Sequence, residues 1–240
     1  MGSRPRFRPV VEHVRSSRPD ILDPAAAIED RRLVVGGVVV TNPKSLVRAD
    51  SPVELRPERR LRGEGKLEAA LAAFSVLVDG RVCLDLGAAA GGFTRVLLRH
   101  GAARVYALDA GFGQLLGELR SDPRVVNLER TNLAQAAAVL PKGPPVGLVT
   151  VDLSYLSLAS ALPQLHGVAF AKDADLIAIV KPQFELALSS PPTRKMQMDQ
   201  AIRVAQRGAE AAGWTVVKTM RSPVRGTKGS AEWLLHGRFS

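Results

Sequence analysis

The stretch Val82-Cys-Leu-Asp-Leu-Gly-Ala-Ala-Ala-Gly-Gly-Phe-Thr94 decides the fold class. Residues Arg81–Leu86 are a short apolar strand, and Thr94–His100 is a helix that ends at Gly101. Glycines between a strand and a helix let the backbone approach a ligand closely and adopt angles that other residues avoid. The stretch therefore predicts a strand, a glycine turn and a helix, with a ligand at the turn.

Strands and helices alternate on both sides of this stretch. A helix is expected over Lys66–Leu77 before it and another over Gln114–Arg120 after it. The further strands expected in chain order are Arg104–Leu108, Val125–Leu128, Val146–Val151 and Leu176–Val180. Such alternation indicates a parallel sheet that is covered on both faces. We expect an α/β fold of Rossmann-like type.

The end of the chain has a different pattern. Trp214–Met220 and Ala231–His236 are two strands joined only by a polar turn, so we expect an antiparallel hairpin. Five parallel strands followed by such a hairpin are typical of class I methyltransferases rather than of a plain Rossmann fold.

The first part of the chain is predicted to be a separate small domain. Pro24–Asp30 favours a helix with proline in its first turn, and Leu33–Val35 with Val38–Val40 favours a hairpin around two glycines. Arg56–Gly65 is charged and glycine-bearing, which is typical of a linker. We therefore expect a small domain over residues 1–57, a linker over 58–65 and a larger domain over 66–240.

The composition favours a globular protein of a reducing compartment. Of the 240 residues, 46% are hydrophobic and 23% are charged, which is too apolar for a disordered chain. The single cysteine, Cys83, excludes an internal disulfide and any metal site built on a cysteine cluster. No signal-like or membrane-spanning segment is evident, so we expect a cytoplasmic protein, a monomer or weak oligomer that binds neither a metal nor a membrane.

The net charge points to a polyanionic partner. The chain has 33 Lys and Arg against 23 Asp and Glu, a formal charge of +10, and nucleic acid is a common polyanion in the cytosol. A composition rich in arginine could also arise without any such partner. Lys218, Arg221, Arg225 and Lys228 lie within eleven residues that contain no acid. We predict that these four side chains contact RNA phosphates.

The spacing of the glycines indicates which ligand the turn holds. A dinucleotide-binding turn has the pattern G-x-G-x-x-G, whereas Gly87, Gly91 and Gly92 form G-x-x-x-G-G. Asp85 would repel a phosphate but would suit the cationic end of S-adenosylmethionine. Asp109 ends the next strand, 24 residues after Asp85, where an acid can accept hydrogen bonds from ribose hydroxyls. Alternatively, the turn is purely structural and Asp109 is only a cap.

Four charged residues are placed where a parallel sheet carries its active site. Asp152 and Lys181 directly follow apolar strands, Glu232 lies just inside the last strand, and Lys66 opens the first helix of the larger domain. Burying a lysine is costly unless it is paired, so a lysine directly after a buried strand suggests a function. Each residue taken alone could equally be a solvated charge at the rim of the sheet.

These motifs resemble those of the TlyA family of ribosomal RNA ribose 2′-O-methyltransferases, long called hemolysins, and of the FtsJ/RrmJ methyltransferases. The matching strings are Leu67-Glu-Ala-Ala-Leu, Cys83-Leu-Asp-Leu-Gly, Gly91-Gly-Phe-Thr, Asp109 with Gly111-Phe-Gly-Gln-Leu, Asp122-Pro-Arg-Val-Val, Glu129-Arg-Thr-Asn132, Asp152-Leu-Ser-Tyr-Leu-Ser-Leu, Val180-Lys-Pro-Gln-Phe-Glu185 and Glu232. The chain departs from the family at Leu61-Arg-Gly-Glu-Gly65, at Ala89-Ala90 and in a shorter segment after Glu185.

The resemblance implies roles for particular residues. The family's Lys-Asp-Lys-Glu catalytic tetrad falls on Lys66, Asp152, Lys181 and Glu232. The residues expected to bind S-adenosylmethionine are Asp85, Gly87, Gly91, Gly92, Phe93, Asp109 and Asn132. The residues before the linker are similar to a degenerate alpha-L RNA-binding domain. The implied partner is therefore RNA, either free ribosomal RNA or a ribosomal subunit.

Chemistry supports the same interpretation of the tetrad. A ribose hydroxyl is a poor nucleophile at neutral pH, and Lys181 could take or polarise its proton while Asp152 holds Lys181 in place. Lys66 and Glu232 would orient the hydroxyl and the second ammonium, and no metal is required. The alternative hypotheses are a non-catalytic RNA-binding protein with a methyltransferase fold and a methyltransferase acting on a small molecule. A membrane-lytic function is disfavoured, because the sequence lacks an apolar segment suited to a membrane.

Overall fold

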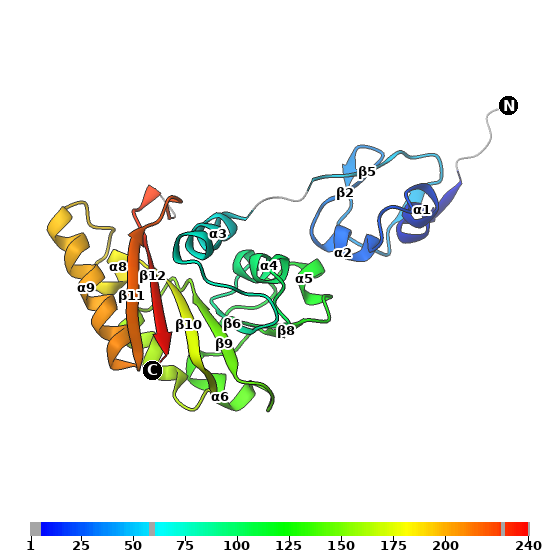
Figure 1. The fold of residues 1–240 in the computed structure, drawn as a ribbon. Coiled ribbons are helices and arrows are strands. Elements are labelled where there is room, and N and C mark those ends of the chain that lie inside the picture. Colours follow the sequence, from blue (N-terminus) through cyan, green and yellow to red (C-terminus); the bar gives the residue numbers. More distant parts are fainter. Residues whose placement is uncertain (1–5, 58–60, 227–228, 240) are drawn as a thin grey trace. The chain divides into compact units, whose positions relative to one another are not determined.

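The computed structural model describes residues 6–57, 61–226 and 229–239. It contains two compact units (Figure 1). The smaller unit comprises residues 1–60 and 116–122, and the larger one comprises residues 61–115 and 123–240.

The smaller unit combines short strands with short helices. Its elements are β1 (Phe7–Pro9), α1 (Val10–Ser17), α2 (Pro24–Glu29), β2 (Leu33–Val35), β3 (Val38–Val39), β4 (Leu46–Arg48), β5 (Val53–Leu55) and α5 (Gly117–Arg120). Strand β1 pairs with β4, and β2 pairs with both β3 and β5. Gly36 and Gly37 have φ angles of 59° and 80°, as a two-residue hairpin turn requires, so the expected β2–β3 hairpin is confirmed. The likeness to an alpha-L domain stays a prediction.

The larger unit is built on one seven-stranded sheet. Its strands are β6 (Val82–Leu86), β7 (Arg104–Leu108), β8 (Val125–Leu128), β9 (Val146–Val151), β10 (Phe170–Val180), β11 (Trp214–Arg221) and β12 (Trp233–Phe239). The spatial order is β11-β12-β10-β9-β6-β7-β8. The five strands from β10 to β8 are parallel, and β12 is antiparallel to both of its neighbours. The expected methyltransferase sheet with a terminal hairpin is therefore confirmed.

Helices cover both faces of this sheet. They are α3 (Arg62–Phe74), α4 (Gly92–Arg99), η1 (Leu133–Gln135), α6 (Ala136–Val139), α7 (Leu158–Ala161), η2 (Leu162–Leu165), α8 (Pro182–Glu185) and α9 (Lys195–Ala211). Helix α4 packs on β6 and β7 and α3 on β12, whereas α9 packs on β10, β11 and β12 from the other side (Figure 1). Both faces of the parallel strands are thus covered, which explains the nearly continuous apolar sequences of these strands.

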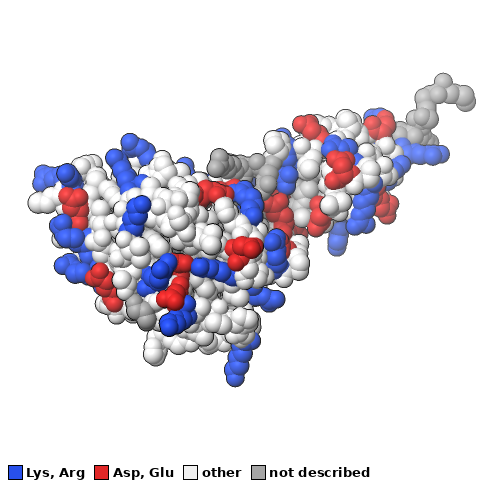
Figure 2. Space-filling view, viewed as in Figure 1, with Lys and Arg blue, Asp and Glu red and all other residues white. Residues whose placement is uncertain are grey.

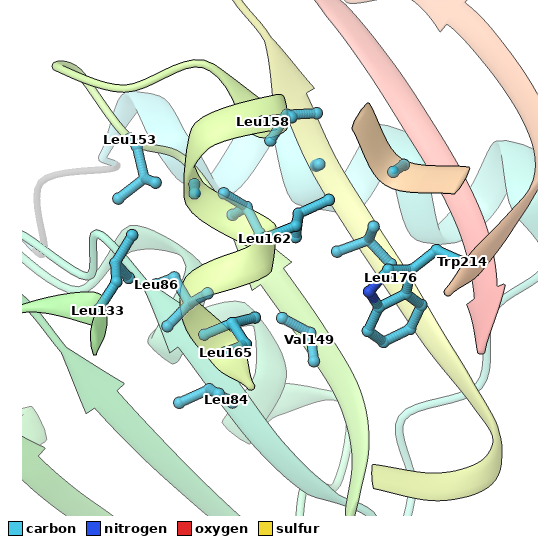
Figure 3. Packing of buried hydrophobic residues seen from close by; sticks show 14 of the residues in the cluster. Leu84, Leu86, Leu133, Val149, Leu153, Leu158, Leu162, Leu165, Leu176 and Trp214 are labelled. Atoms are coloured by element: carbon cyan, nitrogen blue, oxygen red, sulfur yellow. The ribbon is translucent and has the colours of Figure 1, made fainter. Parts of the chain in front are cut away.

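The main hydrophobic core lies on the face that α7, η2 and α9 cover. Figure 3 shows its centre, where side chains from the strands meet those of α7 and η2: Leu84, Leu86, Val149, Leu176, Leu158, Leu162 and Leu165. Trp214 closes the core beside Leu176. This packing fixes the carboxyl ends of the parallel strands, which is where the predicted site residues lie.

Some predicted boundaries differ from the observed ones. Helix α3 begins at Arg62, inside the predicted linker 58–65, and ends at Phe74 because Ser75 is left-handed with a φ of 55°. Helix α5 keeps only the last part of the predicted Gln114–Arg120 helix, since the residue before it, Leu116, has a non-helical backbone with a ψ of 143°. Among the described residues, no helix is both long and apolar enough to span a bilayer.

Candidate active site

The glycine turn lies between β6 and α4, as predicted. Gly87 has a φ of 82° and Gly91 one of 93°, a region that favours glycine. A Cβ atom on Gly87 would lie 2.8 Å from the carbonyl oxygen of Asp152. The turn is therefore pressed against the end of β9, and any side chain at Gly87 would push the two strand ends apart.

Asp85 occupies a different place from the one we predicted. Its side chain is only 1% exposed and accepts hydrogen bonds from the hydroxyls of Thr94 (2.7 Å) and Thr150 (2.9 Å). Burial raises the pKa of Asp85 to about 6, against the two threonines, which lower it. Side chains alternate between the faces of a strand, so Asp85 points opposite to Leu84 and Leu86, toward α4. It fixes the start of α4 from behind instead of facing a sulfonium directly.

Asp109 holds two loops together at the end of β7. Its carboxylate accepts the backbone N–H groups of Ala89 (2.9 Å) and Gly111 (2.7 Å). A Cβ atom on Gly111 would come within 3.0 Å of this carboxylate. Asp109 is partly exposed, so its oxygens remain within reach of a ligand beside the glycine turn. A contact between Asp109 and a cofactor ribose stays a prediction.

Two other residues predicted to bind the cofactor differ in their exposure to solvent. Phe93 is buried in α4, and its ring lies against Gly63 of α3, where a Cβ atom would be 3.3 Å from it. This packing makes Phe93 a contact between helices, and its role in cofactor binding stays a prediction. Asn132 is exposed at the start of η1, and its backbone N–H donates to Gln135 Oε1 (2.9 Å). Its side chain is available to a ligand.

The four predicted tetrad residues converge at the carboxyl end of the sheet. Lys66 Nζ lies 2.7 Å from Glu232 Oε2 and 3.2 Å from Asp152 Oδ2. Lys181 Nζ lies 2.6 Å from Asp152 Oδ1 and donates to the carbonyl oxygen of Leu153 (2.7 Å). Asp152 therefore bridges two ammonium groups. Two positive and two negative charges, from segments far apart in the chain, form one cluster beside the glycine turn.

The cluster keeps Lys66 in its charged form. Desolvation would lower its pKa, but Asp152 and Glu232 outweigh that effect and raise the pKa of Lys66 above its usual value. Lys66 and Glu232 are both buried, and removing either partner would leave a charge without compensation. Asp152 and Lys181 are more exposed, with side-chain exposures of 19% and 16%. Asp152 and Lys181 are therefore the more accessible half of the cluster.

A cavity of about 200 Å³ opens beside this accessible half. Lys181 and Glu232 contribute the charged part of its wall, and Phe184 of α8 contributes an aromatic part. The remaining lining residues are Ser154, Pro182, Gln183, Pro191, Ser230 and Ala231. A mixed apolar and polar wall with two convergent charged groups is typical of a small-molecule or nucleotide subsite.

The predicted basic group is divided in the structure. Lys218 lies within β11, and its Nζ donates to the carbonyl oxygen of Ala73 (3.2 Å) near the end of α3. Arg221 and Arg225 are exposed at the other end of β11 and in the turn after it, next to the β12 end that carries Glu232. Lys228 lies outside the described residues. Lys218 therefore caps a helix, and the two arginines are the predicted cations that border the site.

The face drawn in Figure 2 carries Lys and Arg singly and in small groups among acidic side chains. The excess of positive charge is thus dispersed on this face. The position of Arg221 and Arg225 beside the site is more informative about binding than the overall charge.

Two buried glutamates escape the sequence-based selection of functional candidates. Glu185 ends α8, is 9% exposed, and its Oε1 accepts the N–H of Leu158 (2.9 Å) at the start of α7. Glu64 falls in the predicted linker, but it lies in the first turn of α3 and accepts the N–H of Leu61 (2.8 Å). The usual capping signature needs Ser or Thr three residues before the glutamate, and Leu61 stands there, so no such sequence signal marks Glu64.

Comparison with known families agrees with this geometry. A family described as FtsJ-like methyltransferase matches residues 59–239, most of the chain and nearly all of the larger unit. The chain belongs to the FtsJ-like methyltransferase family. The seven-stranded sheet of the larger unit is therefore that of a methyltransferase of this family.

Individual relatives of the chain include a named rRNA methyltransferase and a protein named as a hemolysin. The chain is 46% identical over 181 residues to the 16S/23S rRNA (cytidine-2′-O)-methyltransferase TlyA of Mycobacterium tuberculosis (strain CDC 1551 / Oshkosh). This match covers 72% of the chain and 66% of the relative, slightly under two thirds of its length. Hemolysin A of Brachyspira hyodysenteriae is 32% identical, with 84% of the chain and 87% of the relative covered.

A solved structure reproduces the fold. The crystal structure of a hemolysin-named protein from Lactococcus lactis superimposes with a TM-score of 0.71 and 35% identity, covering 76% of this chain and 90% of that one. Membership of the methyltransferase family makes S-adenosylmethionine the cofactor. The FtsJ-like site is compatible with this molecule, because the turn takes left-handed backbone angles at Gly87 and Gly91 and Asp109 presents a partly exposed carboxylate next to it.

Proposed function

We propose that this methyltransferase modifies a ribose 2′-hydroxyl of ribosomal RNA. The observation that carries the proposal is the cluster in which Asp152 bridges Lys66 and Lys181 beside the glycine turn. The name of the M. tuberculosis relative supports ribosomal RNA as the substrate and makes a cytidine the first nucleotide to test.

S-adenosylmethionine supplies an electrophilic methyl group that needs no further activation. Backbone atoms of the turn at Gly87 and Gly91 would hold it, with Asp109 on its ribose and Asn132 nearby. The remaining task of the protein is to place a hydroxyl in line with that methyl group and to accept its proton, and such positioning supplies much of the rate.

Lys181 is the residue we assign to the proton. Its Nζ is anchored by Asp152 Oδ1 and by the Leu153 carbonyl, and it lines the cavity that a ribose would enter. Lys181 would polarise or accept the 2′-hydroxyl proton, while S-adenosylmethionine would supply the methyl group to that oxygen and leave as the uncharged thioether.

Lys66 and Glu232 are assigned to position the substrate and the other charges. Lys66 stays an ammonium, because Asp152 and Glu232 together raise its pKa. It therefore anchors Asp152 from the buried side and leaves the opposite oxygen of Asp152 to Lys181. Glu232 also lines the cavity, so it can accept a hydrogen bond from a ribose hydroxyl there.

The RNA chain is proposed to cross the site along the exposed arginines. Arg221 and Arg225 lie next to the end of β12 that carries Glu232, so they are placed to contact phosphates on either side of the target nucleotide. The smaller unit, which resembles an alpha-L domain, is proposed as a second RNA contact. Both contacts would be electrostatic and would carry little sequence information.

Lys181→Ala tests the catalytic part of the proposal. We expect methyl transfer from radiolabelled S-adenosylmethionine to ribosomal subunits to fall by at least about a hundredfold, as for loss of a general base. Lys172→Ala is the matched control, because Lys172 is exposed near the opposite end of the same strand, β10. Unchanged transfer by the Lys181 variant, with calorimetry showing normal cofactor binding, would refute the assigned role. An absence of cofactor binding in the wild type would favour a non-catalytic RNA-binding protein.

Arg221→Ala together with Arg225→Ala tests the RNA contact. Removing each phosphate interaction should reduce the slope of log K against log salt by about 0.7 to 1. Lys218→Ala is the control, because its ammonium is bound to the end of α3 and should change the slope little. Equal slopes for the double variant and the wild type would exclude the two arginines as phosphate-binding residues.

A further inference from the structure

Glu64 is a buried acid two residues before Lys66 on α3. It is 2% exposed. Its carboxylate has three partners: the backbone N–H of Leu61 at the start of α3, and the side chains of Arg95 and Arg99 in α4. Oε1 accepts the N–H of Leu61 (2.8 Å) and lies 2.9 Å from Arg95, while Oε2 lies 2.9 Å from Arg99. Every oxygen of this buried carboxylate is thus engaged by a defined donor.

These partners join the two helices that matter most for the site. Arg95 and Arg99 belong to α4, which begins directly after the glycine turn, whereas Glu64 and Lys66 belong to the first turns of α3. The backbones are also close at this point, because a Cβ atom on Gly92 would lie 3.3 Å from the backbone nitrogen of Glu64. A shift of α3 along α4 would therefore break the Glu64 contacts and move Lys66 together with them.

The charge of Glu64 is held firmly. Burial would raise its pKa, but the Leu61 N–H and the two arginines outweigh burial and lower the pKa of Glu64 below its ordinary value. A buried, fully partnered carboxylate tolerates little displacement, since leaving any of its charged partners uncompensated is costly. The Glu64 contacts thus define one position of α3 relative to the glycine turn.

We propose that Glu64 is a positioning residue that sets the place of the Lys66 ammonium relative to the glycine turn. The expected effect of Glu64 on kcat rests on the proposed function. Its structural content is independent of that function, because the position of Lys66 can be measured without substrate. Glu64 belongs to the segment Leu61–Gly65, where the chain departs from the family it resembles.

Glu64→Gln is the test, and Glu68→Gln is the matched control. Glu68 lies on the same helix and pairs with Arg99 (3.0 Å) and His100 (2.8 Å) of the same neighbouring segment, but it neither caps α3 nor contacts Arg95 in the described structure. Two readouts are needed. One is the rate at which acetic anhydride labels Lys66, measured by peptide mass spectrometry with exposed Lys172 as the internal reference. The other is kcat for methyl transfer, measured well below the unfolding temperature of each variant.

We expect Glu64→Gln to speed the labelling of Lys66 several-fold. It should also lower kcat by roughly ten- to a hundredfold, since a misplacement of about 1 Å can cost about a hundredfold. KM for S-adenosylmethionine should stay unchanged, and Glu68→Gln should alter neither readout. Equal labelling of Lys66 in the wild type and Glu64→Gln would overturn the proposal. Altered labelling in a protein that never methylates RNA would instead refute the proposed function and leave the positioning role standing.

A milder variant keeps the test decisive if Glu64→Gln does not fold. Arg99 is 47% exposed in its side chain and contacts both Glu64 and Glu68, so Arg99→Gln weakens the hold on Glu64 at a tolerant position. Faster labelling of Lys66 in Arg99→Gln than in Glu68→Gln supports the proposal, because both variants lose the Arg99–Glu68 ion pair and only Arg99→Gln also loses the contact with Glu64. Equal labelling in the two variants overturns it.

Discussion

Glu185→Gln should make the stability of this protein much less dependent on pH. The Glu185 carboxyl is buried at the end of α8, and among the described residues it receives only the Leu158 N–H, on one oxygen. Burial raises its pKa from 4.5 to about 7, and the Leu158 N–H lowers it by less than burial raises it. Glutamine has nearly the same shape and can keep the bond to Leu158, but it carries no proton that titrates in this range.

The magnitude follows from the two pKa values. Between pH 4.5 and 7 the folded state holds a proton on Glu185 that the unfolded chain has already released, so stability falls as the pH rises through this window. One pKa unit corresponds to about 1.4 kcal/mol, which makes the total about 3 kcal/mol. The free energy of unfolding of Glu185→Gln, relative to wild type, should therefore rise by about 3 kcal/mol from pH 4.5 to about pH 8 and then stay constant.

Urea denaturation followed by circular dichroism at pH 4.5, 5.5, 6.5, 7.5 and 8.5 measures this difference. Glu210→Gln is the control, because Glu210 is exposed on α9 and its replacement should give a nearly flat difference. A Glu185→Gln difference that is equally flat would show that the buried carboxyl does not titrate as the structure implies. The hydrogen bond between Glu185 and the Leu158 N–H would then not involve a carboxyl that is protonated near neutral pH.

Three further substitutions have expected outcomes. Gly87→Ala should greatly weaken S-adenosylmethionine binding in calorimetry, because its Cβ would lie 2.8 Å from the Asp152 carbonyl oxygen at a φ of 82°. Lys66→Met should lower the free energy of unfolding by about 3–5 kcal/mol in urea titrations, and adding Glu232→Gln should recover part of that loss. Asp85→Ala should cost about 1–3 kcal/mol by the same measurement, because it leaves two buried threonine hydroxyls without their acceptor; a loss below about 0.5 kcal/mol would contradict that account.

Much of the fold can be predicted from local pattern. The glycine turn is predicted correctly because glycines at positive φ follow directly from the sequence of a strand-to-helix turn. The parallel sheet and the terminal hairpin are likewise indicated by the order and spacing of apolar segments. Helix ends are less accurate, since α3 begins at Arg62 through a cap that only the Glu64 side chain supplies.

The direction of individual side chains is harder to predict. Asp85 is expected to face the ligand, but its place in the alternation of β6 turns it toward Thr94. That error is avoidable, because the same two-residue period governs Leu84 and Leu86. Lys218 is grouped with Arg221 by sequence distance, whereas only the packing of β11 near α3 shows that its ammonium reaches Ala73.

The sequence by itself determined the alternation of strands and helices in the parallel part of the sheet, the glycine turn between β6 and α4, and the identity of the four charged residues at the edge of the sheet. These features depend on backbone preferences and periodicity, which act over a few residues. Only the tertiary structure decided that Asp152 bridges Lys66 and Lys181, that Glu64 ties α3 to α4, and that Glu185 is buried with a raised pKa. Distances between charges and the loss of water around them arise when segments far apart in the chain pack together, and no local pattern encodes that geometry.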